Sequence, residues 1–312
     1  MFEQYPHYEY LCAQVQLVLF MLGMGATLRA ADFLGIWQQP HSFLLGAFGQ
    51  FVVTPLLALL VSWGAGLEPG IAVGLILIAA MPGGTLAKAF TVLGRGNIAL
   101  SITLTIFGTL AALISVPVLL RLLAADYVPA DFAMPVGAVL RDLVLYLLLP
   151  LGGGILVARQ WPAGAPAFSK WCIRLGFVAV VAMVTGSLGS GRIRPGAHGW
   201  QVALAIIAFC VLAQQLSMLP LRLLRWPKPD VLSVGVEVTM RNLNLALLLK
   251  ALLFPADSPG HELGDGVLFV ILFYAGVAMG AGLPLALMFR RRIRRAEMAE
   301  ASLAFTNPEG AP

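Results

Sequence analysis

Three ionisable side chains lie deep within apolar stretches of this sequence: Lys88, Glu237 and Arg241. A charged side chain at the centre of a bilayer costs about 2.5–3.5 kcal/mol on insertion scales, so it is tolerated where it pairs or lines a cavity. One acid and two bases in such surroundings can hold an ion, move a proton or attract a charged solute. These three residues are therefore the first candidates for function.

The composition explains why the surroundings are apolar. The 312 residues are 59% hydrophobic and 11% charged, whereas soluble domains carry about 25% charged residues. This excludes a soluble single-core enzyme and a disordered chain. The three cysteines are odd in number and lie in apolar stretches, so no disulfide framework follows. We predict an all-α polytopic membrane protein.

Nine segments are long and apolar enough to cross the membrane, since a helix needs about 20 such residues. No soluble domain fits between them, so we expect a single transmembrane domain over 1–312 with a basic tail at 290–312. The predicted segments lie at about 9–29, 42–63, 69–93, 97–123, 134–158, 168–188, 199–224, 231–254 and 265–289.

Basic residues orient these segments, because cytoplasmic loops are enriched in Lys and Arg. With the N-terminus outside, 13 basic residues are cytoplasmic, and five (Arg121, Arg141, Arg192, Arg194 and Lys250) lie on the opposite side. We therefore predict a plasma (inner) membrane protein with its C-terminus in the cytoplasm. The basic residues form no soluble face, so we expect no nucleic-acid partner. The cytoplasmic set is Arg29, Arg95, Arg159, Lys170, Arg174, Arg222, Arg225, Lys228, Arg290, Arg291, Arg292, Arg294 and Arg295.

Two of the predicted spans contain helix-breaking or polar runs near their middle. The span at 69–93 contains Pro82-Gly83-Gly84, and the span at 231–254 contains Gly235 and the polar run from Glu237 to Asn244. Paired broken helices indicate the central site of a transporter. The N-termini of half-helices carry free N–H groups that suit an anionic solute. The alternative is a pair of kinked helices with a packing role.

Several motifs resemble those of the bile acid:sodium symporter family. They are the runs 23–28, Pro82-Gly83-Gly84-Thr85, 95–101 and 237–242, together with Gln50. The resemblance implies a secondary transporter with core and panel domains, built from inverted repeats with two discontinuous crossing helices. The repeats would lie at about 9–123 and 134–289, without the extra first helix of ten-helix members.

The resemblance also implies two sodium sites around the crossing, and this sequence departs from both. The family's serine-asparagine pair after the Pro-Gly-Gly-Thr motif is here Ala87-Lys88, and its glutamine after the methionine is Arg241. Each site has therefore lost a neutral ligand and gained a cation. The first site maps to Ala87, Lys88, Ser101, Thr105 and Glu237, and the second to Gln50, Glu237, Val238, Met240 and Arg241.

Charge arithmetic suggests the consequence of these replacements. Glu237 with Lys88 and Arg241 carries the same net charge as one glutamate with two sodium ions, so the tethered cations could occupy the ion sites and pair with Glu237. We therefore predict sodium-independent transport of an organic anion, with no cofactor. The mode is left open between proton coupling through Lys88, exchange and facilitation. The alternative is that a cation turns away, leaving a symporter with one working sodium site.

Four residues are candidate contacts of the solute. Thr85 and Asn242 match family positions near the bound substrate, while Asn244 and Tyr274 are polar residues of this sequence within apolar spans. Tyr274 stands where some members have an asparagine, and packing is its alternative role. The expected partners are a small organic anion and the lipid bilayer; the sequence predicts no oligomeric state.

Other functional classes fit the sequence less well. The four histidines, His7, His41, His198 and His261, are scattered near span ends and form no zinc motif, so we predict no enzyme. A channel is disfavoured because no polar stripe repeats along several spans. A membrane-embedded sensor lacks a cytoplasmic output domain.

Overall fold

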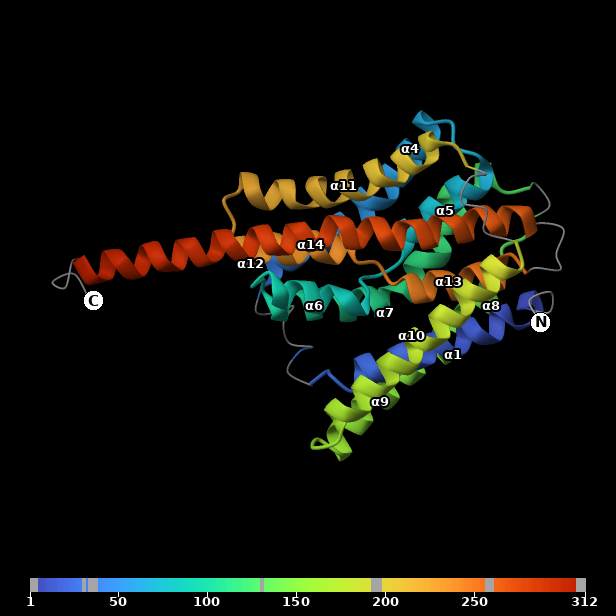
Figure 1. Ribbon diagram of the computed structural model, residues 1–312. Helices are drawn as coiled ribbons and strands as arrows, with labels where there is room; N and C mark the ends of the chain where they lie inside the picture. The colour runs from blue at the N-terminus through green and yellow to red at the C-terminus, as the bar shows by residue number, and fades with distance from the viewer. Residues whose placement is uncertain are drawn as a thin grey trace.

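The computed structural model of the protein describes residues 5–29, 32, 39–129, 132–191, 198–255 and 261–306. Its regular elements are helices, and one isolated bridge joins two segments between them. Figure 1 shows the long helices running along the molecule, with the C-terminal helix extending beyond the others. Arg192 and Arg194, used above for orientation, lie outside the described residues, as do the side chains of His7 and His261.

Six continuous helical segments of the described chain are long and apolar enough to span a membrane. This confirms the predicted all-α polytopic class. Two of these segments contain a short π-helical stretch. The segments are α3–η3–α4 (Pro40–Phe48, Gly49–Val53, Thr54–Gly64), α7 (Ile98–Leu123), α8–η5–α9 (Val136–Asp142, Leu143–Leu148, Leu149–Gln160), α10 (Ala165–Gly189), α11 (Trp200–Leu223) and α14 (His261–Thr306).

The remaining predicted spans are α1 (Tyr5–Gly25) and two interrupted helices. The first interrupted helix consists of α5 (Pro69–Ala80) and α6 (Thr85–Leu93), and the second of α12 (Lys228–Thr239) and α13 (Leu243–Leu253). A short 3-10 helix, η4 (Ala125–Tyr127), follows α7. Both interruptions therefore occur where the sequence predicts them.

The helices pack into two groups. We call α1, α8–η5–α9 and α10 the α1 bundle, because α1 packs mainly on α10 and α9. The other helices form the central bundle, in which α14 packs along α5, and α12 packs on α7 and α11. Gly25 of α1 and Gly154 of α9 meet without side chains, since a Cβ on either would overlap the backbone of the other helix. This contact joins α1 and α9 backbone to backbone.

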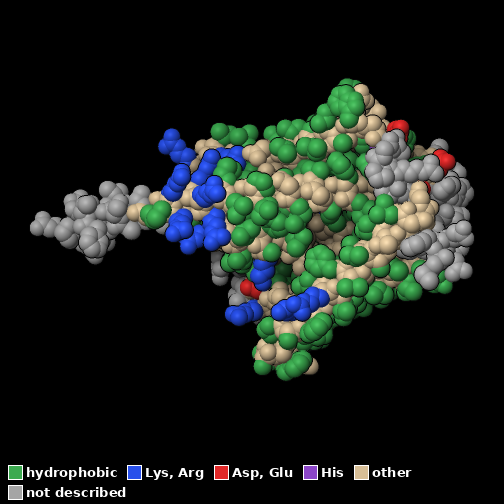
Figure 2. All heavy atoms as spheres, viewed as in Figure 1, with side chains coloured by type: hydrophobic (Ala, Val, Ile, Leu, Met, Phe, Trp, Pro, Cys, Tyr) green, Lys and Arg blue, Asp and Glu red, His purple; other side chains and the backbone are tan. Residues whose placement is uncertain are grey.

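The surface of the described chain suits a lipid environment. Large apolar side chains such as Trp63, Ile114, Trp200 and Leu223 are exposed along the helices. On the face shown in Figure 2, Lys and Arg side chains gather near the end from which the C-terminal helix projects, and hydrophobic side chains cover the middle. An apolar band with a basic margin is typical of a protein that spans a bilayer.

Candidate functional site

The two helix interruptions lie against each other, although they are about half the chain apart in sequence. The Gly84 amide donates to the Met240 carbonyl at 2.6 Å, and the Asn242 amide donates to the Pro82 carbonyl at 2.8 Å. These bonds form an antiparallel bridge between Gly83 and Arg241. Backbone groups released by breaking a helix must find partners within the membrane, and here each interruption satisfies the other.

Glycine is required at this contact because the segments approach so closely. A Cβ on Gly83 would overlap the Glu237 carboxylate, and a Cβ on Gly84 would lie 2.6 Å from the Arg241 carbonyl oxygen. Gly84 therefore excludes a side chain, because backbone atoms oppose it, and a side chain at Gly83 would displace the Glu237 carboxylate from its place. The Pro-Gly-Gly run both ends α5 and permits the second interruption to reach it.

Glu237 lies beside this contact in a cluster of hydroxyl groups. Its side chain, on a residue only 1% exposed, accepts from the Ser101 hydroxyl at 2.5 Å. The Thr105 hydroxyl lies 3.0 Å from both carboxylate oxygens. Thr91 extends the cluster by donating to the Ser101 hydroxyl at 3.3 Å. Three residues of the predicted first ion site are thus brought together on α7 and α12.

Arg241 links the two interruptions through its side chain. The residue is 4% exposed, and its Nη1 donates to the Met81 carbonyl at 2.9 Å. Nε and Nη2 are buried without a hydrogen-bond partner in the described chain. No ion pair joins Arg241 to Glu237 among the described residues, so the expected pairing is not formed. The guanidinium instead binds a main-chain carbonyl of the opposite interruption.

Lys88 is half-buried and faces a different direction from that expected. It lines a small cavity of about 40 Å³ with Met24, Thr85 and Thr105. The charged groups that act on its ammonium are Asp32 and Arg29. In the described part of the chain it forms no ion pair with Glu237. Of the two outcomes that the sequence left open for Lys88, this geometry is that of a cation turned away from the carboxylate.

The other residues of the predicted ion sites lie around the same contact. Gln50, in the π-helical stretch η3, is buried near Gly108 of α7 and its Nε2 has no hydrogen-bond partner in the described chain. Ala87 and Val238 are buried, in α6 and α12. Met240 contributes the carbonyl that receives the Gly84 amide. All these residues therefore surround the junction of the interruptions.

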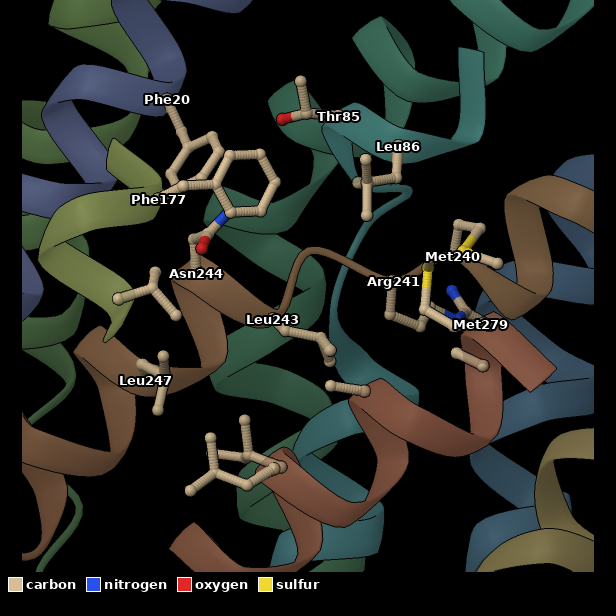
Figure 3. Close-up of a pocket in the computed structure, with 16 residues that line it drawn as sticks. Phe20, Thr85, Leu86, Phe177, Met240, Arg241, Leu243, Asn244, Leu247 and Met279 are labelled. Carbon is tan, nitrogen blue, oxygen red and sulfur yellow. The ribbon is translucent and has the colours of Figure 1, made fainter. Parts of the chain in front are cut away.

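A cavity of about 340 Å³ lies between the junction and the α1 bundle (Figure 3). Thr85 and Asn244, two predicted solute contacts, belong to its lining, and the Thr85 hydroxyl has no hydrogen-bond partner in the described chain. Most of the other lining residues are apolar. The lining consists of Phe20, Gly84, Thr85, Leu86, Phe177, Val180, Met240, Arg241, Leu243, Asn244, Leu247, Ile271, Leu272, Ala275, Ala278 and Met279.

The other two predicted solute contacts lie outside this lining. The Asn242 side chain caps α13, where its Oδ1 accepts from the Leu245 amide at 3.1 Å. The Tyr274 hydroxyl is buried and donates to the Thr239 carbonyl at 2.9 Å. Tyr274 thus caps the end of α12, and its contact with the solute stays a prediction.

Two aromatic residues of the cavity were not predicted from the sequence. Phe20 of α1 and Phe177 of α10 pack edge to face, with ring centroids 5.1 Å apart. In Figure 3 this aromatic pair lies next to Asn244, and Arg241 lies at the other end of the lining. Phenylalanine is common in apolar spans, so nothing local distinguishes these two positions. Only the packing of the α1 bundle against the junction reveals them.

A pair of broken helices that meet beside a cavity is the architecture of a membrane transporter. The profile of the Sodium Bile acid symporter family matches residues 14–189. The chain belongs to this family, whose named members are transporters and not enzymes.

Individual relatives agree with this assignment. An uncharacterized sodium-dependent transporter of Bacillus subtilis, YocS, is 30% identical over 75% of this chain and 71% of its own length. A probable chloroplast sodium/metabolite cotransporter of Arabidopsis thaliana, BASS1, is 32% identical over 75% of this chain. A sodium-dependent organic anion transporter of Rattus norvegicus is 26% identical over 78% of this chain. The matches span 58% and 65% of these last two proteins, less than two thirds of their length.

Proposed function

We propose that this protein is a secondary transporter that moves a small organic anion by alternating access. The cavity beside the paired interruptions carries the proposal, because such a position is where transporters bind their solutes. Its volume, about 340 Å³, is near the lower end of the range for ligand pockets, about 300–1,000 Å³. The names of the sodium-dependent organic anion and metabolite transporters among its relatives support the same class of solute.

The charges around the cavity favour an anion. Arg241 belongs to the lining, and Lys88 lines the adjoining small cavity, which shares Gly84 and Thr85 with the larger one. The α6 helix begins at Thr85 without a side-chain cap, so its N-terminal partial positive charge faces the same place. Glu237 is engaged by Ser101 and Thr105. A carboxylate or sulfonate would therefore meet an electropositive end of an apolar cavity.

We further propose that no sodium ion binds at the second predicted ion site, because the Arg241 guanidinium takes its place. The guanidinium links the two interruptions by binding the Met81 carbonyl. In the family pattern, the second sodium ion would link them instead. A sodium ion 4 Å from this charge would be repelled by about 4 kcal/mol at an effective dielectric of 20. A permanent cation of the protein thus replaces an exchangeable one.

A one-sodium symporter is the second candidate. The orientation of Lys88 favours it, because Glu237, Ser101 and Thr105 keep their oxygen atoms together while the ammonium lies elsewhere. Oxygen atoms are the ligands that hard cations prefer. The two candidates differ in one measurable property, the sodium dependence of solute binding.

Binding of organic anions to the purified protein tests the proposal. A panel of aliphatic and aromatic carboxylates and sulfonates is screened by thermal shift in sodium and in potassium buffers. A ligand that binds the folded protein raises the unfolding temperature, and the stabilisation grows with the logarithm of its concentration divided by its dissociation constant. We expect at least one anion to stabilise the protein equally in both buffers, and uncharged amides of the same shape to have no effect. Stabilisation that requires sodium would establish the one-sodium alternative, and no stabilisation by any anion would contradict the solute class.

The variant Arg241→Gln restores the residue type of the family at this position. If Arg241 replaces a sodium ion, the variant should bind the same anion more tightly in sodium than in potassium.

Lys88→Asn serves as the matched second variant. If Lys88 carries a coupled proton, this variant keeps anion binding but loses the response of uptake to an imposed pH gradient in proteoliposomes. An unchanged response excludes proton coupling through Lys88.

We also propose that the protein lies in the plasma (inner) membrane, and that its end rich in Lys and Arg faces the cytoplasm. The basic side chains near α14 in Figure 2 support this orientation. Protease cleavage of a tag placed after residue 312 in inverted membrane vesicles, but not in right-side-out vesicles, is the expected result.

A further inference from the structure

A buried ion pair joins the two bundles far from the junction. Lys250 Nζ of α13 lies 2.6 Å from Glu9 Oε1 of α1, and their side chains are 0% and 3% exposed. Two turns further along α1, Gln16 Nε2 donates to the Asn244 carbonyl of α13 at 2.8 Å. We call these four residues the α1–α13 seam.

The seam leads from the cavity to one end of the molecule. Asn244 belongs to the cavity lining, and Lys250 lies near the end of α13. Glu9 and Gln16 are seven residues apart, about 10 Å along a helix. Figure 1 shows α1 and α13 close together at the end where the N-terminus lies, opposite the end from which the C-terminal helix projects. A path from the cavity to that end would pass along these side chains.

An ion pair at this position is unexpected if its role is only to stabilise. Burying two charges costs much of what their attraction returns, so a buried ion pair is weak support for stability. Ionisable residues within the membrane commonly mark solute or ion pathways. This pair also crosses the boundary between two bundles, whereas Tyr10 and Asp142 form a hydrogen bond within the α1 bundle. The seam therefore lies on the boundary between the two bundles and not inside either one.

We propose that the Glu9–Lys250 pair closes the cavity at this end, and that Lys250 becomes an anion-binding site when the seam opens. In the closed form the Glu9 carboxylate is paired with the Lys250 ammonium. In the open form the carboxylate or sulfonate of an incoming solute takes its place before reaching the cavity. This inference rests on the proposed transport of organic anions, and it adds a residue outside the junction to the path.

Thiol labelling tests the seam without any solute or ion gradient. Leu247→Cys places a thiol in the cavity lining, in a chain whose Cys12, Cys172 and Cys210 are replaced by alanine. Membrane-impermeant methanethiosulfonates, one bearing a sulfonate and one a trimethylammonium group, are added only on the side where α13 ends. Glu9→Gln should raise the sulfonate labelling rate about tenfold, because labelling follows the open population. The sulfonate reagent should react faster than the ammonium reagent.

Three further variants decide the outcome. Glu9→Gln combined with Lys250→Met should label quickly but without preference for the sulfonate. The exchange Glu9→Lys with Lys250→Glu should return to the slow labelling of the parent, which also shows that the chain still folds. Asp142→Asn, which removes a buried charge beside α1 but not across the seam, should label at the parent rate.

The proposal is overturned if Glu9→Gln leaves the labelling rate unchanged, or if the variant that combines Glu9→Gln with Lys250→Met still prefers the sulfonate reagent. It is also overturned if Asp142→Asn accelerates labelling as much as Glu9→Gln. Because the assay contains no transported solute, its result is separate from that of the anion screen. Labelling as expected together with a negative anion screen would retain the seam and reject the proposed solute class.

Discussion

Replacing Gly84 by alanine perturbs the junction at its closest backbone approach. The added Cβ would lie 2.6 Å from the Arg241 carbonyl oxygen and 3.1 Å from that of Met240, whereas ordinary contacts begin at 3.4 Å. The interruptions must therefore separate by about 0.8 Å at this point, since backbone atoms on both sides leave no flexible group to yield.

The cost follows from the bonds that this separation breaks. The Gly84 amide to Met240 carbonyl bond and the Asn242 amide to Pro82 carbonyl bond both cross the contact. Leaving a buried backbone group without its partner costs about 1–3 kcal/mol. Losing both bonds would therefore destabilise the protein by about 2–6 kcal/mol. Gly276→Ala is the matched control, because no atom lies within 4 Å of its added Cβ.

Unfolding in detergent by heat or denaturant, followed by tryptophan fluorescence, measures this difference. We expect Gly84→Ala to unfold well below the parent and Gly276→Ala to unfold at or slightly above it, since alanine favours the helix. If Gly84→Ala and Gly276→Ala unfold together with the parent, the close contact of the interruptions does not contribute as argued.

Three other variants test the remaining contacts. Thr105→Val removes a hydroxyl from Glu237 and should lower the free energy of unfolding by about 1.5–3 kcal/mol, as for hydrogen bonds to charged groups; Ser115→Ala, also on α7, is its control. Tyr274→Phe should cost about 0.5–1.5 kcal/mol of stability and leave anion affinity unchanged; weaker binding would assign Tyr274 to the solute site. Phe177→Ala should weaken binding of the anion found by thermal shift, and the exposed neighbour Val178→Ala should not; equal affinities would exclude the aromatic pair from the site.

The junction could be predicted from the sequence because its causes are local. A single proline does not end a helix here, since Pro117, Pro220 and Pro284 lie inside α7, α11 and α14. The run Pro82-Gly83-Gly84 does indicate the interruption, because a missing backbone donor is followed by two residues with poor helix propensity. The grouping of Ser101, Thr105 and Glu237 required the family resemblance, because these residues come from helices far apart in the chain. The structure places them within hydrogen-bond distance.

The partners of the long charged side chains could not be predicted in the same way. Lys88 lies in the first turn of α6, and the charged groups that act on its ammonium are Asp32 and Arg29 rather than Glu237. Lys250 was counted among the basic residues of the outer side, yet it is buried against Glu9. That pair joins residues 241 positions apart, and no local pattern marks such a contact. Sequence spacing identifies helices and their faces, but the packing of separate helices decides which charges meet.

The backbone contact of Gly25 with Gly154 determines how movement spreads through the α1 bundle. With no side chains between them, α1 and α9 have no compressible layer that could absorb a displacement. A displacement of α1 at this contact must therefore be followed by α9, because neither backbone can yield. We expect the two helices to move as one unit wherever the α1 bundle moves against the central bundle.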